Sequence, residues 1–360
     1  MDSNLYTIPE RNNIIADDLV QIASADLPWN KLEGKSIIVT GGSGFLASYL
    51  VKAILTANEL FNLNCTVVCV VRSMTSVHFR LGSYVDHPHL KIVEHDVIKP
   101  FPEIYPQAQY IIHAASQASP KFYGIDPVGT LSTNSIGTSH LLSYAVKSKV
   151  KRFLFFSSGE VYGNHVKQNI RIGETNFGSI DPTDVRSCYA ESKRMGETMC
   201  VSWAQQYGLH TIIVRPFHTY GPGMDLKDGR VFADFVSDIV NNKNLSIKSD
   251  GTARRAFLYI SDATKAFLTV LLKGKKAGAY NVGNPNAEIS IKDLAKTLTK
   301  LFPAKNLKAK FEKLSPKSPY LRSPIQHACP AIDKIQKLNW KPTISIEDGF
   351  RRTVLSFENI

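Results

Sequence analysis

"IIVTGGSGFLASYL", residues 37–50, is the stretch that decides which fold this chain is expected to adopt. Its first four residues are β-branched, which is typical of a buried strand, and the residues after the glycines favour a helix. Between the two, Gly41, Gly44 and Ala47 form a G-x-x-G-x-x-A pattern. Glycines at this place let the backbone approach a pyrophosphate at the positive end of the helix. The stretch therefore predicts a dinucleotide-binding loop rather than a plain tight turn.

The same rhythm of short strands and longer helices continues along the chain. Apolar runs lie at residues 36–40, 65–71, 90–95, 109–115, 152–157 and 210–216, and helix-like segments at 47–60, 130–148 and 191–208. Continuous apolar strands that alternate with helices are typical of a parallel sheet covered on both faces. We therefore expect an α/β protein with a Rossmann-type, doubly wound parallel sheet.

Changes in composition divide the chain into three parts. Residues 1–34 precede the first strand and are expected to form an N-terminal extension with a helical patch at 16–27. Residues 35–215 are expected to form the dinucleotide-binding Rossmann domain. From "PFHTYGPGMDLKDG" onward the rhythm breaks, so residues 216–360 are expected to be mainly a smaller C-terminal substrate-binding domain. The pattern leaves open whether strands of this region return to the sheet.

Composition and charge favour a soluble enzyme with an anionic small-molecule substrate. The chain has 360 residues, 43% hydrophobic and 21% charged, and a net charge of +12. Its basic residues are dispersed and form no Lys/Arg-rich run, so nucleic-acid binding is not expected. A positive surface also raises the capture of anionic ligands. No apolar run approaches the roughly 20 residues that span a bilayer, so membrane insertion is not expected.

The cysteines and the N-terminus indicate a cytoplasmic protein without a metal site. The five cysteines are odd in number and scattered, and no histidine cluster completes a zinc pattern: Cys65, Cys69, Cys188, Cys200 and Cys329. We expect reduced thiols. The first residues, "MDSNLYTIPERNN", are polar and do not resemble a signal peptide.

Two further stretches carry the chemistry. "SSGEVYG", residues 157–163, ends a strand with Ser158 and Glu160, and "YAESK" places Tyr189 and Lys193 one helical turn apart. A tyrosine with a pKa near 10 is a poor base, but a nearby ammonium and a positive nicotinamide ring lower its pKa. Ser158 is then expected to hydrogen-bond the same substrate hydroxyl. The alternative for "SSGEVYG" alone is a turn with a solvated glutamate.

These stretches, together with "HAASQASP", "TNSIGT", "RPFHTYGP" and "RRAFLYISDA", resemble the extended short-chain dehydrogenase/reductases, the NAD-dependent epimerase/dehydratase family that acts on nucleotide sugars. The resemblance covers about residues 35–355. Within the family, "ASPKFYGIDPVGTLSTNSIGT", "VRSCYAESKRMGETMC" and "MDLKDGRVFADF" are most similar to the UDP-glucuronate decarboxylases. The resemblance implies a nucleotide-sugar substrate and a homodimer that pairs the helices near residues 131–147 and 189–206.

The resemblance also assigns expected roles to individual residues. The expected catalytic residues are Ser158, Glu160, Tyr189 and Lys193. The expected cofactor-binding residues are Gly41, Gly44, Phe45, Leu46, Arg72, Asp96, Ala114, Tyr189 and Lys193. The expected substrate-binding residues are Tyr123, Arg186, His218, Arg230 and Arg255; Arg215, His113 and His327 are expected to be structural. Arg255 in "RRAF" has the forked guanidinium that suits a diphosphate.

Several positions leave alternatives open. Arg72 stands where an acidic residue would bind the ribose of NAD, so NAD is expected while NADP is not excluded. Asp96 is either an adenine contact or a loop aspartate, and Arg186 either meets a substrate carboxylate or caps a helix. His218 replaces the family's asparagine in "R-x-F-N", and the tail at residues 322–340 is more similar to epimerases and dehydratases.

The expected reaction begins with oxidation at a sugar C4, after which the 4-ketone makes C5 reactive. A carboxylate on C5 is then lost as carbon dioxide, whereas a CH₂OH group leads to loss of water. Dehydratases carry at residue 159 an aspartate that protonates the departing hydroxyl, and this chain has Gly159. We therefore expect UDP-glucuronate decarboxylation to a UDP-pentose, with Glu160 handling protons at C5. The alternatives are a 4,6-dehydratase, a 4-epimerase or a catalytically silent NAD(P)-binding sensor.

Overall fold

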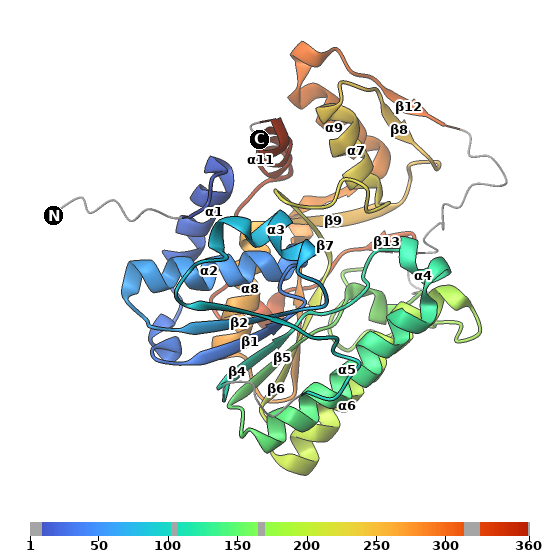
Figure 1. Cartoon of the computed structure of the whole chain (residues 1–360). Coiled ribbons are helices and arrows are strands. Elements are labelled where there is room, and N and C mark those ends of the chain that lie inside the picture. The colour runs from blue at the N-terminus through green and yellow to red at the C-terminus, as the bar shows by residue number, and fades with distance from the viewer. Residues whose placement is uncertain (1–8, 102–106, 165–169, 313–324, 359–360) are drawn as a thin grey trace, which may run out of the picture.

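The computed structural model describes residues 9–101, 107–164, 170–312 and 325–358. Its centre is a seven-stranded parallel sheet, shown in Figure 1, built from β1 (Ser36–Thr40), β2 (Thr66–Val71), β3 (Leu90–Glu94), β4 (Tyr110–His113), β5 (Arg152–Phe156), β6 (Thr211–Pro216) and β10 (Gly278–Val282). The strands lie in the order β10-β6-β5-β4-β1-β2-β3. The chain winds outward from β1 in both directions, which confirms the expected doubly wound sheet.

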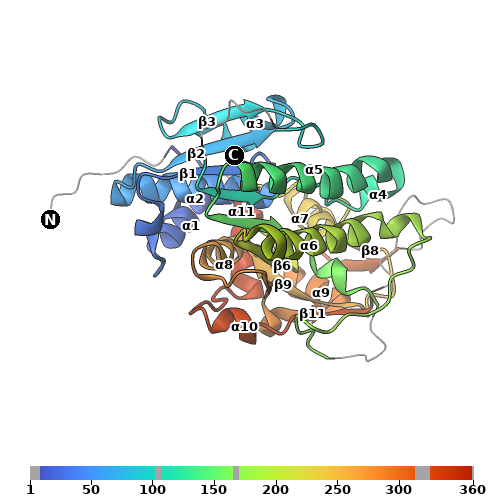
Figure 2. The same ribbon diagram turned by 90° about the horizontal axis from the view of Figure 1, so that it is seen from below.

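Helices cover both faces of this sheet. On one face lie α1 (Asn13–Ala23), α2 (Phe45–Phe61) and α8 (Ile260–Lys273), and on the other α5 (Pro127–Lys147) and α6 (Cys188–Tyr207). The loops carry the short helical turns η1 (Trp29–Leu32), α3 (Thr75–Leu81), η2 (Gly82–Tyr84), α4 (Lys121–Ile125), η3 (Gly159–Tyr162) and η4 (Val185–Ser187). Figure 2 shows α5 and α6 running side by side.

Alternation along each strand produces the two halves of the core. In β1, Ile37 and Val39 pack toward the face of α2 and α8, whereas Ile38 packs toward α5 and α6. In β2, Val68 and Val70 join Ile38 on the second face. Because both faces are buried, the inner strands are mainly apolar, which is why their sequences were recognisable as apolar runs. The edge strand β3 carries the exposed residues Lys91 and Glu94.

A second, smaller lobe follows the sixth strand. It contains β7 (His218–Tyr220), α7 (Val231–Val240), β8 (Leu245–Ile247), β9 (Arg254–Tyr259), η5 (Pro285–Ala287), β11 (Glu288–Ser290), α9 (Ile291–Leu301), η6 (Pro303–Lys305), β12 (Ala309–Phe311), β13 (His327–Ala328) and α11 (Ile346–Glu358). The short helix α10 (Asp333–Gln336) instead packs against β10 of the central sheet. β9 pairs with β7, β11 and β13, and β12 pairs with β8. Within the described residues, no helix is both long and apolar enough to cross a membrane.

The N-terminal segment and the region after residue 215 both contribute to the Rossmann half. α1 contacts α2, α8 and α11, so the part of residues 1–34 that the structure describes lies against the main fold; residues 1–8 are outside the described ranges. Elements from beyond residue 215 also return: α8 covers the sheet, β10 pairs with β6, and α10 packs against β10. The three-part division of the chain stays a prediction. The elements that pack on the Rossmann half from outside residues 35–215 do not follow its boundaries.

Candidate active site

A cavity of about 490 Å³ lies at the carboxyl ends of the parallel strands, where the smaller lobe meets the sheet. Every residue expected to act in the site lines it except Asp96 and Arg186. Those that line it are Gly41, Gly44, Phe45, Leu46, Arg72, Ala114, Tyr123, Ser158, Glu160, Tyr189, Lys193, His218, Arg230 and Arg255. Residues from five strand ends and from the smaller lobe thus meet in one place, as expected for a ligand site at a switch point of a doubly wound sheet.

The loop between β1 and α2 has the geometry of a pyrophosphate cradle. Gly41 has φ +66°, and a Cβ there would lie 2.7 Å from the Cα of Ala115. Gly44 caps α2 without any side-chain hydrogen bond to the first turn, which contains no acidic residue. The N–H groups at the start of α2 therefore stay available to an anion beside Phe45 and Leu46, which line the cavity. The residues present fit a dinucleotide.

Arg72 and Asp96, the two expected cofactor contacts for which the sequence left alternatives, lie in different surroundings. Arg72 follows β2, is exposed and lines the cavity, so it is accessible to a bound nucleotide. Asp96 follows β3, and its carboxylate accepts a hydrogen bond of 3.2 Å from the Ile98 amide. The structure therefore places Asp96 in a turn outside the cavity lining, and it brings Arg72 to the site.

Ser158, Tyr189 and Lys193 lie together at the end of β5 and the start of α6. Burial raises the pKa of Tyr189 to about 12; a hydrogen bond with Ser158 lowers it, the Glu160 carboxylate raises it and Arg230 lowers it. The Lys193 Nζ lies 5.8 Å from the Tyr189 ring and donates to the Phe156 carbonyl oxygen over 2.7 Å. Burial and the Glu160 carboxylate thus oppose the expected lowering of the Tyr189 pKa by positive charge, which stays a prediction.

Buried charged and polar side chains lie near Lys193. Burial lowers the pKa of Lys193 to about 7, against the attraction of Glu197. Glu197 accepts a 2.5 Å hydrogen bond from Ser157 and forms a two-point ion pair with Arg215 at 2.8 and 2.5 Å. His113 donates to or accepts from Thr40 and Thr138, and burial lowers its pKa to about 3. Arg215 and His113 thus contact protein groups, as structural residues do.

Glu160 lies near Tyr189, and the Phe217 ring lies next to the backbone at Gly159. The Glu160 carboxylate is close enough to raise the pKa values of both Tyr189 and Tyr123. At Gly159, a Cβ would lie 3.3 Å from the Phe217 ring, closer than a side chain is normally accommodated. Phe217 therefore packs against the backbone where a dehydratase would carry its acid, while Glu160 lines the cavity.

Tyr123 stacks on the Tyr189 ring, and its hydroxyl donates to a backbone carbonyl. The two rings stack with centroids 5.1 Å apart and an interplanar angle of 14°. The Tyr123 hydroxyl donates to the Ala118 carbonyl oxygen over 3.0 Å. The Arg186 Cζ lies 5.9 Å from the centroid of the Tyr123 ring, and Arg186 is outside the cavity lining.

The part of the cavity formed by the smaller lobe carries Arg230 and Arg255. Arg230 forms an ion pair with Asp228, and Arg255 donates to the backbone carbonyls of Arg254, Ile325 and Gln326. Burial lowers the pKa of His218 well below its ordinary value, and the charges of Arg255 and Arg230 lower it further. His218 is therefore neutral, and its buried Nδ1 has no hydrogen-bond partner within the described part of the chain.

Three cavity residues were not expected from the sequence. Arg80 and Phe217 line the site, as does Asp228. Asp228 stands two residues before Arg230 in "DGRV", so a search for a carboxylate beside the diphosphate arginine would have found it. Phe217 belongs to "RPFH", in which only His218 was expected to bind the substrate. Arg80 carries no local signal, because its place in the site depends on how α3 packs.

Comparison with known proteins agrees with this geometry. The family described as "NAD dependent epimerase/dehydratase family" matches residues 37–283. UDP-glucuronic acid decarboxylase 6 of Arabidopsis thaliana is 33% identical over 314 residues, which cover 87% of this chain and 86% of that protein. UDP-glucuronic acid decarboxylase 1 of Xenopus tropicalis is 32% identical over 327 residues, which cover 90% of this chain and 72% of that protein.

Solved structures share the fold at lower identity. The UDP-glucuronic acid 4-epimerase of Bacillus cereus, solved with UDP-glucuronic acid and NAD, gives a TM-score of 0.74 at 23% identity, covering 90% of this chain and 99% of that one. The dTDP-glucose 4,6-dehydratase of Bacillus anthracis gives a TM-score of 0.74 at 22% identity, covering 90% and 96%. With the fold, the glycine loop and the family match in agreement, the chain belongs to the NAD-dependent epimerase/dehydratase family, which confirms the resemblance drawn from its motifs.

Proposed function

We propose that this chain is an NAD-dependent decarboxylase that converts UDP-glucuronate to a UDP-pentose. The observation that carries the proposal is the arrangement around Tyr189, where Glu160 lies beside the tyrosine and Phe217 closes the space next to Gly159. Similarity to UDP-glucuronic acid decarboxylases over most of the chain supports the same substrate. The arrangement offers a proton donor for C5 and no acid for a departing hydroxyl at residue 159.

In this mechanism NAD supplies the acceptor for the C4 hydride and returns that hydride within the same turnover. Tyr189 takes the proton of the C4 hydroxyl, and Ser158 hydrogen-bonds the same oxygen. The positive charge that favours the phenolate comes from Lys193 and from the bound cofactor, since burial alone opposes it. Lys193 is held for this role by the Phe156 carbonyl and by Glu197.

The second half of the reaction takes place at C5. Once C4 is a ketone, the sugar is a β-keto acid, so the C5–carboxylate bond breaks and carbon dioxide leaves without needing a proton. The electron pair left on C5 must then be protonated. We propose that the Glu160 carboxyl, which lines the cavity, donates this proton and regains one from water before the next turnover. Tyr189 afterwards returns its proton to the C4 oxygen as the hydride comes back.

The positively charged end of the cavity is the proposed place of the substrate's diphosphate. Arg255 lies near the start of β9, and Arg230 directly precedes α7. Neutral His218 lies close enough to both arginines for their charges to lower its pKa, and its Nδ1 has no partner among the described residues, where the family's asparagine would hold the nucleotide. We propose that His218 makes one hydrogen bond to the substrate in place of the amide.

The same account implies a cytoplasmic homodimer that purifies with a tightly held nicotinamide cofactor. A panel assay tests the function: the protein is incubated with UDP-glucuronate, dTDP-glucose and UDP-N-acetylglucosamine, and product masses are followed. Loss of carbon dioxide from the uronate supports the proposal. Loss of water from a hexose with no reaction on the uronate would instead establish a 4,6-dehydratase, and an isomer of unchanged mass an epimerase.

A further inference from the structure

Arg80 joins two loops on opposite sides of the cavity. It belongs to α3, and its Nη1 donates to the Ser43 carbonyl over 3.1 Å, in the glycine loop after β1. Its Nε donates to the Gly223 carbonyl over 3.0 Å, in the loop that follows β7 in the smaller lobe. One guanidinium thus spans from the cofactor cradle to the substrate side of the protein.

The guanidinium keeps donors available for a ligand. It has five N–H groups, of which two serve the carbonyls of Ser43 and Gly223, and the described residues provide no further hydrogen bond to it. Arg80 lines the same cavity as Gly44 and Phe45 at the N-terminus of α2. A fixed cation and a helix N-terminus at one end of a cavity both favour a bound phosphate group.

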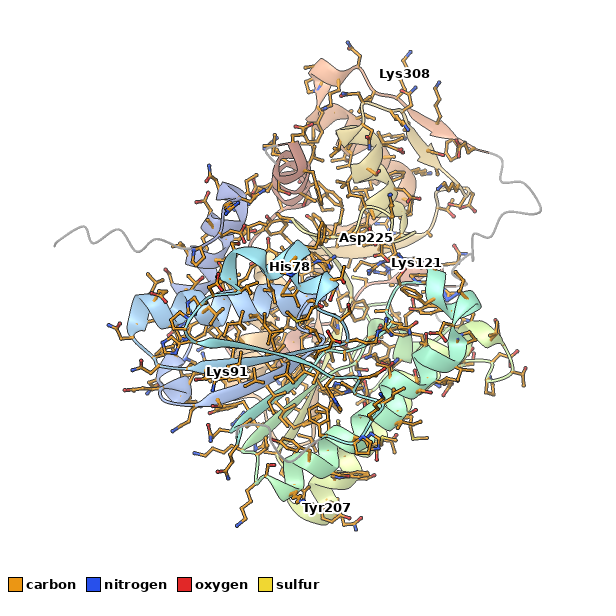
Figure 3. All side chains as sticks on the ribbon, in the orientation of Figure 1. His78, Lys91, Lys121, Tyr207, Asp225 and Lys308 are labelled. Atoms are coloured by element: carbon orange, nitrogen blue, oxygen red, sulfur yellow. The ribbon has the colours of Figure 1, made fainter. Side chains whose placement is uncertain are left out.

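The loop held by Arg80 continues to the substrate end. Residues 221–230 run from Gly221 to Arg230, and the Ser119 hydroxyl donates to the Asp228 carbonyl over 2.7 Å. Lys121 forms a 3.3 Å ion pair with Asp225, and Figure 3 shows these two side chains close together between the lobes. The far end of the loop therefore reaches Arg230, the proposed diphosphate contact.

The charges of this loop also act on Arg80 directly. Burial lowers the pKa of the Arg80 guanidinium, and the carboxylates of Asp225 and Asp228 oppose that effect. Asp228 in turn pairs with Arg230. A phosphate that attracts the guanidinium would pull on the Gly223 carbonyl and change the balance between these carboxylates and Arg230. The glycine loop and Arg230 are thus connected through Arg80, the loop 221–230 and the Asp228 carboxylate.

We propose that Arg80 binds the diphosphate of the dinucleotide and, through the Gly223 carbonyl, orders the loop 221–230 for the UDP group, so that NAD and UDP bind cooperatively. The inference rests on the proposed function, because it needs both ligands. Coupling between two binding equilibria is reciprocal, so UDP must tighten NAD by the same factor that NAD tightens UDP. The effect can therefore be read from binding alone.

The test is calorimetric titration of NAD into protein freed of nucleotide, with and without saturating UDP. We expect UDP to tighten NAD in the wild type. Arg80→Met should weaken NAD on the order of 10- to 100-fold, the cost of a lost charged hydrogen bond, and remove the UDP effect. Arg80→Lys should keep part of the affinity but also lose the UDP effect, because an ammonium does not reproduce the planar fork. Arg351→Met, an exposed arginine on α11, is the matched control and should bind both ligands as the wild type does.

The possible results distinguish a failure of the role of Arg80 from a failure of the proposed decarboxylase function. A wild type that binds NAD with no effect of UDP, or an Arg80→Met variant with unchanged NAD affinity, would overturn the role of Arg80 and leave the proposed reaction standing. A wild type that fails to bind NAD would overturn both. If Arg80→Met does not fold, Arg80→Lys decides: loss of the UDP effect supports the proposal, and its persistence overturns it.

Discussion

At the scale of single residues, burial and chemistry oppose each other at Tyr189. The same enclosure that excludes water from the site raises the pKa of this tyrosine to about 12 and lowers that of Lys193 to about 7. A buried phenolate must therefore be stabilised by positive charge, and the dinucleotide contributes part of it. The motif located these residues correctly in one cavity, but the direction of the tyrosine's shift depends on packing that no motif records.

Replacing the proton acceptor should stop the first step. In Tyr189→Phe, turnover is expected to fall by about 10²- to 10⁴-fold, because the general base is lost while the ring and its stacking on Tyr123 remain. UDP-glucuronate binding should stay near the wild-type value. Stopped-time product assays and calorimetry measure the two quantities. Tyr207→Phe, on the exposed end of the same helix, is the control, and near-full activity of Tyr189→Phe would disprove the assignment.

Replacing Glu160 should stop a later step. Glu160→Gln keeps the shape of the side chain but cannot supply a proton to C5, so turnover is expected to fall by about 10²- to 10⁴-fold. C4 oxidation should still proceed, and reduced nicotinamide should accumulate, which its absorbance reports. Glu191→Gln, a half-exposed ion-pair partner of Arg194, is the matched control. A Glu160→Gln variant that neither loses turnover nor accumulates reduced cofactor contradicts the role.

At the scale of elements, the sequence predicted the strands and helices that are recognisable from their own residues, without knowledge of what they pack against. The six strands β1 to β6 are continuous apolar runs, and α2, α5 and α6 follow them in the expected order. β10 was not predicted, because "GAYNV" is short and weakly apolar and becomes a strand through pairing with β6. Arg80 was missed for the same reason, since its position depends on contacts with Ser43 and Gly223.

The helix α1 is fastened to the fold by a buried carboxylate. Asp18 accepts from Tyr259 over 2.7 Å and forms a 2.7 Å ion pair with Arg352 of α11. Burial raises the pKa of Asp18 from 3.8 to about 6, although Arg352 and the Tyr259 hydroxyl lower it. A raised pKa in the folded state means that Asp18 contributes stability below pH 3.8 and that this contribution is lost as the pH rises through about 6.

This linkage predicts a pH-dependent difference between Asp18→Asn and the wild type. The shift corresponds to about 3 kcal/mol, so the stability of the wild type relative to Asp18→Asn should decrease by about that amount as the pH rises from 3.8 to 6. Denaturant unfolding at several pH values measures it. Asp17→Asn, exposed on the same helix, should show no such trend. A constant difference between Asp18→Asn and the wild type would refute the buried-carboxylate account.

At the scale of the whole molecule, one exposed apolar face supports the proposed dimer. Along α5 and α6, which lie side by side in Figure 2, several large apolar side chains are exposed: Val128, Leu131, Ile136, Met195 and Val201. Exposed apolar side chains gathered on one face mark an interaction surface more often than scattered ones do. A symmetric pair of such faces would bury the helices of two copies against each other.

Charge placed in this face should separate the subunits. Ile136→Arg is expected to shift the protein from dimer to monomer, because a cation would be buried against its own copy in a symmetric contact. Sedimentation velocity measures the change. Phe311→Arg, which alters an exposed aromatic on β12 of the other lobe, should leave the oligomeric state as it is. A wild type that is monomeric at all concentrations would contradict the dimer.

The central claim joins decarboxylation to oxidation and reduction at C4, and one labelled substrate tests both. UDP-glucuronate carrying deuterium at C4 is turned over by the purified full chain, and the product is analysed by mass spectrometry and NMR. Because the hydride is taken from C4 and returned within the same site, we predict a UDP-pentose that has lost carbon dioxide and retains the deuterium at C4. A product that keeps its carboxylate, or that has lost the deuterium to solvent, would contradict the account.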